Sequence, residues 1–89
     1  MDYQYPDNIK SRLKRIEGQA RGVLRLMEEQ QPCKDVVAQL SAIRNAADKA
    51  IAQIVAENLL HCIQTEQAAG DPDTERLVEE AVKLLVKSR

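Results

Sequence analysis

The longest stretch of the sequence without glycine or proline, residues 33–69, reads CKDVVAQLSAIRNAADKAIAQIVAENLLHCIQTEQAA. Its apolar residues recur every three to four positions, which is the spacing of one face of an α-helix. A second row of apolar residues beside the first widens that face. The stretch therefore predicts one long helix over residues 33–67. The first row is Val36, Leu40, Ile43, Ala47, Ala50 and Ile54, and the second is Val37, Ile51, Val55, Leu59 and Cys62.

A shorter helix is predicted on each side of the long one. The first covers residues 8–30, with Asp7 as its N-cap, and Pro32 opens the long helix in the first turn, where its missing N–H costs nothing. The third covers residues 72–88, with Asp71 as N-cap and Pro72 in its first turn. Residues 1–89 are thus expected to form one all-α domain, preceded by an N-terminal arm of residues 1–7. The apolar stripes are Ile9, Leu13, Ile16, Ala20, Val23 and Met27 in the first helix, and Leu77, Val78, Ala81, Leu84 and Leu85 in the third.

The chain is too small and too poor in aromatic residues to build a large core alone. It has 89 residues, two Tyr and neither Phe nor Trp, and a domain of this size buries only roughly 60% of its unfolded surface. Two long antiparallel helices with a wide apolar face favour a dimer that forms a four-helix bundle. No apolar run approaches a membrane span and no signal peptide is present, so we expect a cytoplasmic protein with no membrane partner.

The basic residues are concentrated in the first helix. The formal net charge of the chain is −1, yet residues 8–25 carry +5, which leaves −6 for the rest. A solvated face usually mixes both signs, whereas a basic stripe suits phosphate contacts, and assembly multiplies it. The connections are unsuited to a helix-turn-helix, so DNA would bind the flank of a bundle. The candidate DNA-binding residues are Lys10, Arg12, Lys14, Arg15, Arg21, Arg25 and Arg44.

The two cysteines are candidates for redox sensing. Cys33 and Cys62 lie 29 residues apart, or about 43 Å along a helix, whereas a disulfide needs Cα atoms within about 7 Å. An antiparallel second chain could place its Cys62 beside Cys33. The helix N-terminus and Lys34 favour the thiolate of Cys33, which makes it the leading nucleophile. Two alternatives stay open, namely two inert buried cysteines, and a metal site of Cys33, Cys62 and His61.

Nothing in the sequence indicates an enzyme. It contains no Ser/His/Asp set, no glycine-rich phosphate loop and no distinctive pair of carboxylates.

Five short segments resemble the copper-sensing operon repressor family of bacterial regulators. They are residues 15–19 (RIEGQ), 33–36 (CKDV), 39–42 (QLSA), 57–62 (ENLLHC) and 79–82 (EEAV). The resemblance implies an antiparallel four-helix-bundle dimer, two of which form a homotetramer that represses transcription by binding operator DNA. Copper-sensing members hold Cu(I) with a Cys, a His and a second Cys. The position of that His, four residues before the second Cys, is Asn58 here.

Asn58 makes the chain most similar to the branch of this family that senses persulfides and regulates sulfide detoxification genes. This similarity implies that persulfide or polysulfide donors act as inducers, without a cofactor, by linking Cys33 of one subunit to Cys62 of another through a di- or polysulfide. Each added sulfur extends the bridge by about 2 Å. The alternatives are a repressor that responds to Cu(I) or another metal through the same cysteines, and a helical interaction module.

Overall fold

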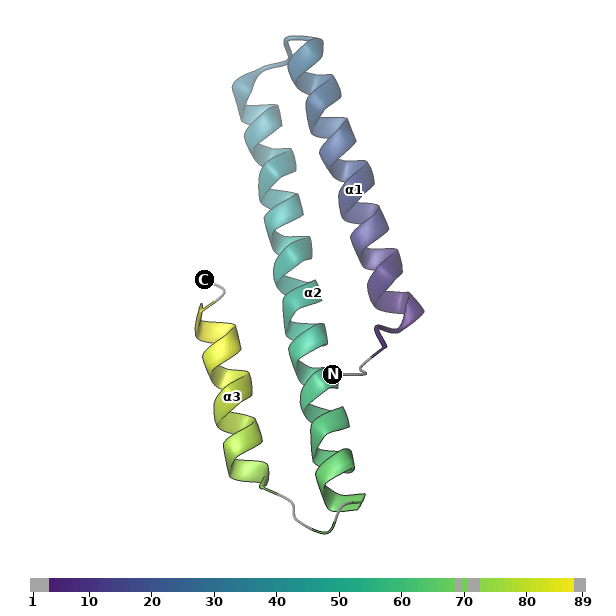
Figure 1. Ribbon diagram of the computed structural model, residues 1–89. Helices are drawn as coiled ribbons and strands as arrows, with labels where there is room; N and C mark the ends of the chain where they lie inside the picture. The colour runs from purple at the N-terminus through teal and green to yellow at the C-terminus, as the bar shows by residue number, and fades with distance from the viewer. Residues whose placement is uncertain (1–3, 69, 71–72, 88–89) are drawn as a thin grey trace. The chain divides into compact units, whose positions relative to one another are not determined.

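The computed structural model describes residues 4–68, 70 and 73–87, and these form three α-helices without a strand. Helix α1 spans Asp7–Glu28, α2 spans Cys33–Ala68 and α3 spans Thr74–Lys87 (Figure 1). The predicted all-α class is confirmed. The bounds of α1 and α2 differ from the predicted ranges 8–30 and 33–67 by at most two residues, whereas the predicted ends of the third helix, residues 72 and 88, lie outside the described residues. None of the described helices is long and apolar enough to cross a membrane.

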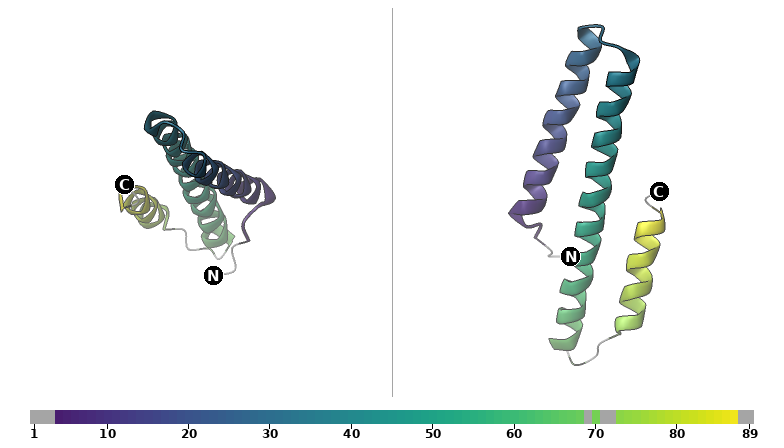
Figure 2. Two further views of the ribbon diagram at one scale, coloured as in Figure 1. Left: turned by 90° about the horizontal axis from the view of Figure 1, so that it is seen from above. Right: turned by 180° about the vertical axis from the view of Figure 1, so that it is seen from behind.

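The first compact unit, Pro6–Ala50, contains α1 and the beginning of α2. The two segments run antiparallel in both Figure 1 and Figure 2. Ile9 and Val23 on α1 are buried, each with 4% of its surface exposed. Three residues of the predicted stripe, Leu13, Ala20 and Met27, are exposed, because a single neighbouring helix covers only part of a wide apolar face.

The turn between α1 and α2 is closed by backbone hydrogen bonds. The N–H of Gln31 donates to Leu26 O at 2.9 Å, and the N–H of Gln30 donates to Met27 O at 3.1 Å. Gln30 lies in the left-handed region, with φ of 56°, so the turn has the hydrogen-bond pattern of a Schellman motif without its usual glycine. At the other end of α1, the predicted N-cap was wrong by one residue. Pro6 occupies that position and makes no side-chain cap.

The second compact unit contains the later part of α2, from Ile51, together with α3. Leu77 and Ala81 are buried at 7% and 8% exposure. The predicted cap of α3 at residues 71–72 lies outside the described residues. Asp73 acts as a cap, since its Oδ1 accepts the N–H of Arg76 at 3.2 Å.

Both units leave large apolar side chains exposed. Examples are Leu24 on α1 at 57%, Leu60 on α2 at 55% and Val82 on α3 at 51%. Ordered folds seldom leave so much apolar surface in contact with water. The exposure supports the predicted assembly of several chains, which stays a prediction.

Candidate functional site

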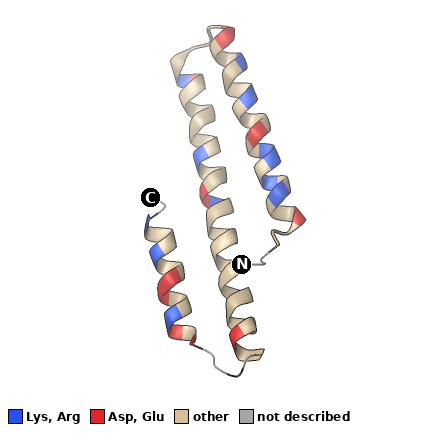
Figure 3. Cartoon of the chain, in the orientation of Figure 1, with Lys and Arg blue, Asp and Glu red and all other residues tan. Residues whose placement is uncertain are grey.

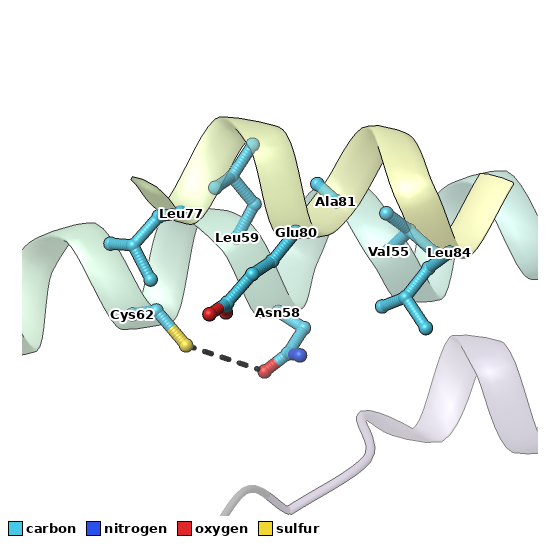
Figure 4. A pocket seen from close by; sticks show the side chains of 8 residues that line it. All are labelled: Val55, Asn58, Leu59, Cys62, Leu77, Glu80, Ala81 and Leu84. Atoms are coloured by element: carbon cyan, nitrogen blue, oxygen red, sulfur yellow. Dashed lines mark hydrogen bonds between the residues drawn. The ribbon is translucent and has the colours of Figure 1, made fainter. Parts of the chain in front are cut away.

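The two cysteines occupy different environments on α2. Cys33, the first residue of the helix, is exposed, Cys62 is half-buried, and both are free thiols. Both cysteines belong to α2, Cys33 at its start and Cys62 in its later part. Cys62 borders a small cavity of about 50 Å³ formed by α2 and α3 (Figure 4). Its other lining residues are Val55, Asn58, Leu59, Leu77, Glu80, Ala81 and Leu84.

Asn58 lies one helical turn before Cys62 and contacts it. The thiol of Cys62 donates a hydrogen bond to Asn58 Oδ1, with 3.8 Å between sulfur and oxygen (Figure 4). The contact follows from the spacing of four residues, which places both side chains on one face of α2. An amide oxygen holds the thiol in place but is a poor ligand for a soft metal ion.

A cluster of charges lies beside Cys62, around Arg76. The guanidinium pairs with Glu66, with Glu80 at 3.0 Å and with Asp73 at 3.5 Å. Its hydrogen bond to Glu80 and the charge of Glu66 raise the pKa of Arg76 above its ordinary value. Three carboxylates around one guanidinium leave a formal charge of −2, so the cluster disfavours anions near Cys62.

Glu66 links the end of α2 to the start of α3. One oxygen of its carboxylate pairs with Arg76, and the other accepts the N–H of Asp73 at 2.8 Å. The cluster borders a pocket of about 310 Å³ next to the cavity. Sequence analysis missed this cluster. The spacing of Asp73, Arg76 and Glu80 could have indicated it, whereas the contact with Glu66 depends on how α3 packs. The pocket is lined by His61, Cys62, Thr65, Glu66, Arg76, Leu77 and Glu80.

A three-ligand metal site is absent from the described part of a single chain. Residues 4–68, 70 and 73–87 contain no group of three or more His, Cys, Asp or Glu side chains that could hold one ion. His61 is exposed and is the direct neighbour of Cys62 in sequence, which turns it about 100° around the helix. A metal shared by two chains would therefore find its soft ligands in two thiolates, and Cu(I) accepts such ligands.

The predicted DNA-binding residues fall on two surfaces rather than one. Arg12 and Arg15 line a groove of about 290 Å³ between α1 and α2, together with Asn45 and Lys49. We call these four residues and Gln19 the basic groove. It contains three basic residues and no acid among the residues that line it, which also include Ala42 and Ala46.

The remaining basic residues of α1 lie on a face that includes an acid. Lys10 and Lys14 line a shallow hollow with Leu13 and Glu17, and Arg21 pairs with Glu17 at 3.5 Å. Arg25, in the last turn of α1, and Arg44, on α2, are exposed and do not line the groove. Lys49 on α2 lines the groove, although it is not among the candidate DNA-binding residues named from the sequence.

Gln19 adds an open hydrogen-bonding position to the basic groove. Within the described residues, its Oε1 is buried and accepts no hydrogen bond. Buried polar atoms usually have a partner, and this oxygen has none among the described residues.

The whole chain was compared with known proteins. The sequence profile of the family described as "Metal-sensitive transcriptional repressor" matches residues 5–87. The chain belongs to this family.

Two curated relatives and a crystal structure of the family agree with this assignment. The copper-sensing transcriptional repressor RicR of Mycobacterium tuberculosis (strain ATCC 25618 / H37Rv) is 38% identical over 78 residues, which cover 88% of this chain and 81% of RicR. YrkD of Bacillus subtilis (strain 168), described as uncharacterized, is 52% identical over 64 residues, covering 72% of this chain and 100% of YrkD. The copper-sensing repressor CsoR with Cu(I) from Geobacillus thermodenitrificans NG80-2 has a TM-score of 0.76 at 31% identity, over 98% of this chain and 92% of CsoR.

Membership in the repressor family confirms the resemblance found in the sequence. It also agrees with the predicted all-α fold. It also assigns this chain to transcriptional repressors, which are not enzymes. Assignment to the persulfide-sensing branch is not confirmed, and both named relatives with a stated inducer are copper sensors. The comparisons therefore favour the metal alternative over the persulfide prediction.

Proposed function

We propose that this member of the repressor family is a cytoplasmic DNA-binding repressor whose hold on operator DNA is controlled by pairs of cysteines, each shared by two subunits. The observation that carries the proposal is the position of the two thiols. Cys33 opens α2 and Cys62 lies near its other end. An antiparallel second chain would bring its Cys62 to Cys33 and complete two equivalent sites in a dimer.

The basic groove is the first part of the proposed DNA interface. Arg12, Arg15 and Lys49 supply positive charge without a lining acid, and phosphates are bound by such groups. Arg21 contributes less because Glu17 already pairs with it. The remaining candidates from the sequence, Lys10, Lys14, Arg25 and Arg44, would extend the interface beyond the groove.

Cu(I) is the inducer that the comparisons favour. The relatives RicR and CsoR are named for copper sensing, and two thiolates from two chains suit a soft monovalent ion. In this chain Cys33 and the partner's Cys62 would hold the ion, and binding would link two subunits. Asn58 offers only an amide where copper sensors of the family place a histidine.

Reactive sulfur is the second candidate, and Asn58 is the observation that favours it. The Cys33 thiolate would attack the outer sulfur of a persulfide, RS–SH, forming Cys33–S–SH and releasing the thiolate RS⁻. The partner's Cys62 thiolate would then attack Sγ of Cys33 itself, so that a Cys33–Cys62 disulfide forms and the outer sulfur leaves as HS⁻. If both cysteines carry a persulfide, the same attack yields a trisulfide. The sulfane sulfur of the donor is the oxidant in each case.

Either bridge would act by stabilising a form of the assembly that binds DNA weakly. A ligand shifts an equilibrium only by its differential affinity for the two forms. A bridge that favours the weak-binding form by about 3 kcal/mol lowers DNA affinity by more than about 100-fold. A large motion is not needed.

The two inducers can be distinguished by DNA release. The probe is a fluorescent duplex selected from a random library by the reduced protein, and its anisotropy is followed without oxygen. Cu(I) or glutathione persulfide is added to the parent, to Cys33→Ser and to Cys62→Ser. We expect release from the parent and retention by both variants.

The bound inducer is then identified by non-reducing mass spectrometry. Release by stoichiometric Cu(I), with retention under persulfide, supports copper sensing. A Cys33–Cys62 link between subunits that carries extra sulfur supports persulfide sensing. If the serine variants release DNA as the parent does, the cysteine proposal is wrong. If the reduced parent selects no duplex, DNA binding is wrong.

A further inference from the structure

Helix α3 partly covers the thiol of Cys62. Leu77 and Ala81 are buried, and both line the small cavity that Cys62 borders (Figure 4). Leu77 also lines the larger pocket beside the same cysteine. Cys62 itself is only half-buried. Access to its sulfur therefore depends on how firmly the start of α3 is held against the later part of α2.

Glu66 makes two polar contacts that hold the start of α3. One oxygen of its carboxylate pairs with Arg76, and the other accepts the N–H of Asp73 at 2.8 Å. Glu66 lies one helical turn after Cys62, so the same stretch of α2 carries the thiol and the group that holds its cover. The side chain of Glu66 is only 25% exposed. A charge-assisted hydrogen bond is stronger in such a partly buried place than on the open surface.

The other carboxylates around Arg76 belong to the α3 side. Glu80 lies one turn further along α3 and Asp73 directly precedes the helix. Acidic and basic residues alternate there, and a further acid lies at the end of α2 (Figure 3). Among the described residues, the ion pair with Glu66 joins Arg76 to α2. Loss of Glu66 would therefore loosen the start of α3, whereas loss of Glu80 would remove the same charge without breaking a contact between the helices.

We propose that Glu66 is a positioning residue for Cys62, which keeps the start of α3 closed over the thiol and limits its reaction. The thiol then reacts mainly when this end of α3 moves away from α2, and its rate follows the population of that open form. The inference rests on the proposed bridge between subunits and adds a control on its second cysteine. Cys33, which is exposed, would react first and Cys62 second.

Alkylation by neutral iodoacetamide measures access to Cys62. Glu66→Gln and Glu80→Gln form a matched pair, since both remove a carboxylate that pairs with Arg76 and lines the pocket beside Cys62. The pH is raised until the rate at Cys62 stops increasing, because the thiol is then ionised in every variant and the lost charge no longer matters. At that limit we expect Glu66→Gln to react about threefold faster than the parent or more, and Glu80→Gln to react like the parent.

Substitutions of Arg76 test the same contact from α3. Arg76→Lys keeps a positive charge that can pair with Glu66, so its limiting rate at Cys62 should stay near that of the parent. Arg76→Gln loses the charge and should match Glu66→Gln. Circular dichroism checks that each variant folds, and the rate at Cys33, which lies in the other compact unit, is the internal reference. If Glu66→Gln does not fold, Arg76→Gln decides the question.

Hydrogen exchange followed by mass spectrometry gives a second measurement. Peptides from α3 should exchange faster in Glu66→Gln than in Glu80→Gln, and peptides from α1 should exchange alike. The inference is overturned if folded Glu66→Gln has the limiting rate of the parent, or if both glutamine variants gain equally. Both measurements are made without DNA or inducer. They can therefore succeed where the proposed DNA release fails, and they can fail where it succeeds.

Discussion

At the scale of single residues, Asn58 and the charges around Arg76 distinguish the two thiols. Asn58 accepts the hydrogen bond of Cys62, and the three carboxylates next to this cysteine exceed the single guanidinium in charge. Cys33 is exposed at the start of α2. The sulfur atoms of Cys33 and Cys62 should therefore differ in two ways. The groups beside them differ in how well they bind a metal ion, and the two thiols differ in their rates of reaction with thiol reagents.

Restoring a histidine at position 58 should strengthen copper binding. Asn58→His adds an imidazole one helical turn before Cys62, and imidazole is a better ligand for Cu(I) than an amide. We expect Cu(I) affinity to rise about tenfold or more, measured anaerobically by competition with a chromophoric Cu(I) chelator. Asn58→Ala is the control. Equal affinity of the two variants would place residue 58 outside the ligand shell.

The charge of the thiol reagent should change how strongly Cys33 is preferred over Cys62. Cys33 is expected to react faster than Cys62 with both neutral iodoacetamide and the anionic Ellman's reagent, because Cys62 is half-buried. The preference should be larger with the anionic reagent, since the carboxylates beside Cys62 repel it. Peptide mass spectrometry gives both rates. Glu80→Gln should narrow the difference between reagents, and an unchanged difference would contradict the electrostatic cause.

At the scale of helices, the sequence predicted which segments are helical better than which side of each is buried. The uninterrupted apolar spacing between Pro32 and Gly70 determines α2, because proline and glycine are the residues that stop a helix. The buried side depends on the neighbouring helix, so Val78 and Leu85 on α3, which the sequence predicts to face inward, are exposed, whereas Leu77 is buried. The separation of Arg12 from Arg21 has the same cause, since α2 packs along only one side of α1.

The turn between α1 and α2 offers a stabilising substitution. Gln30 adopts a positive φ, which costs a residue with a side chain roughly 1–2 kcal/mol, whereas glycine loses about 0.4–1 kcal/mol more entropy on folding. We expect Gln30→Gly to raise the free energy of unfolding by about 0.5–1 kcal/mol, measured by urea denaturation at fixed protein concentration. Gln31→Gly is the control and should not stabilise. Destabilisation by Gln30→Gly would contradict the strain.

At the scale of the whole molecule, a net charge near zero hides an uneven distribution. The chain carries −1 in total, yet the basic groove collects Arg12, Arg15 and Lys49 while the acids near Cys62 lie in the other unit. Sequence reasoning found the basic residues because they cluster along one segment. It did not place Lys49 beside them, since that contact joins two helices.

Salt dependence should separate the two basic surfaces. The logarithm of DNA affinity falls with the logarithm of salt by about 0.9 for each phosphate contacted. Arg15→Ala should reduce that slope by about one unit for each copy that touches DNA. Arg21→Ala should change it less, because Glu17 already pairs with Arg21. Anisotropy titrations over a range of potassium chloride provide the slopes. If Arg21→Ala lowers the slope as much as Arg15→Ala does, the face of α1 that carries Arg21 also contacts phosphates.

The position of Cys33 and Cys62 at opposite ends of one helix has a genetic consequence. If each sensing site takes one cysteine from each chain, a Cys33→Ser chain paired with a Cys62→Ser chain has one site with both cysteines and one site with neither. Two alleles that are unresponsive alone should then complement each other when expressed together, because each mixed dimer keeps one of its two sites. A sensor whose cysteines act within one chain could not show such complementation.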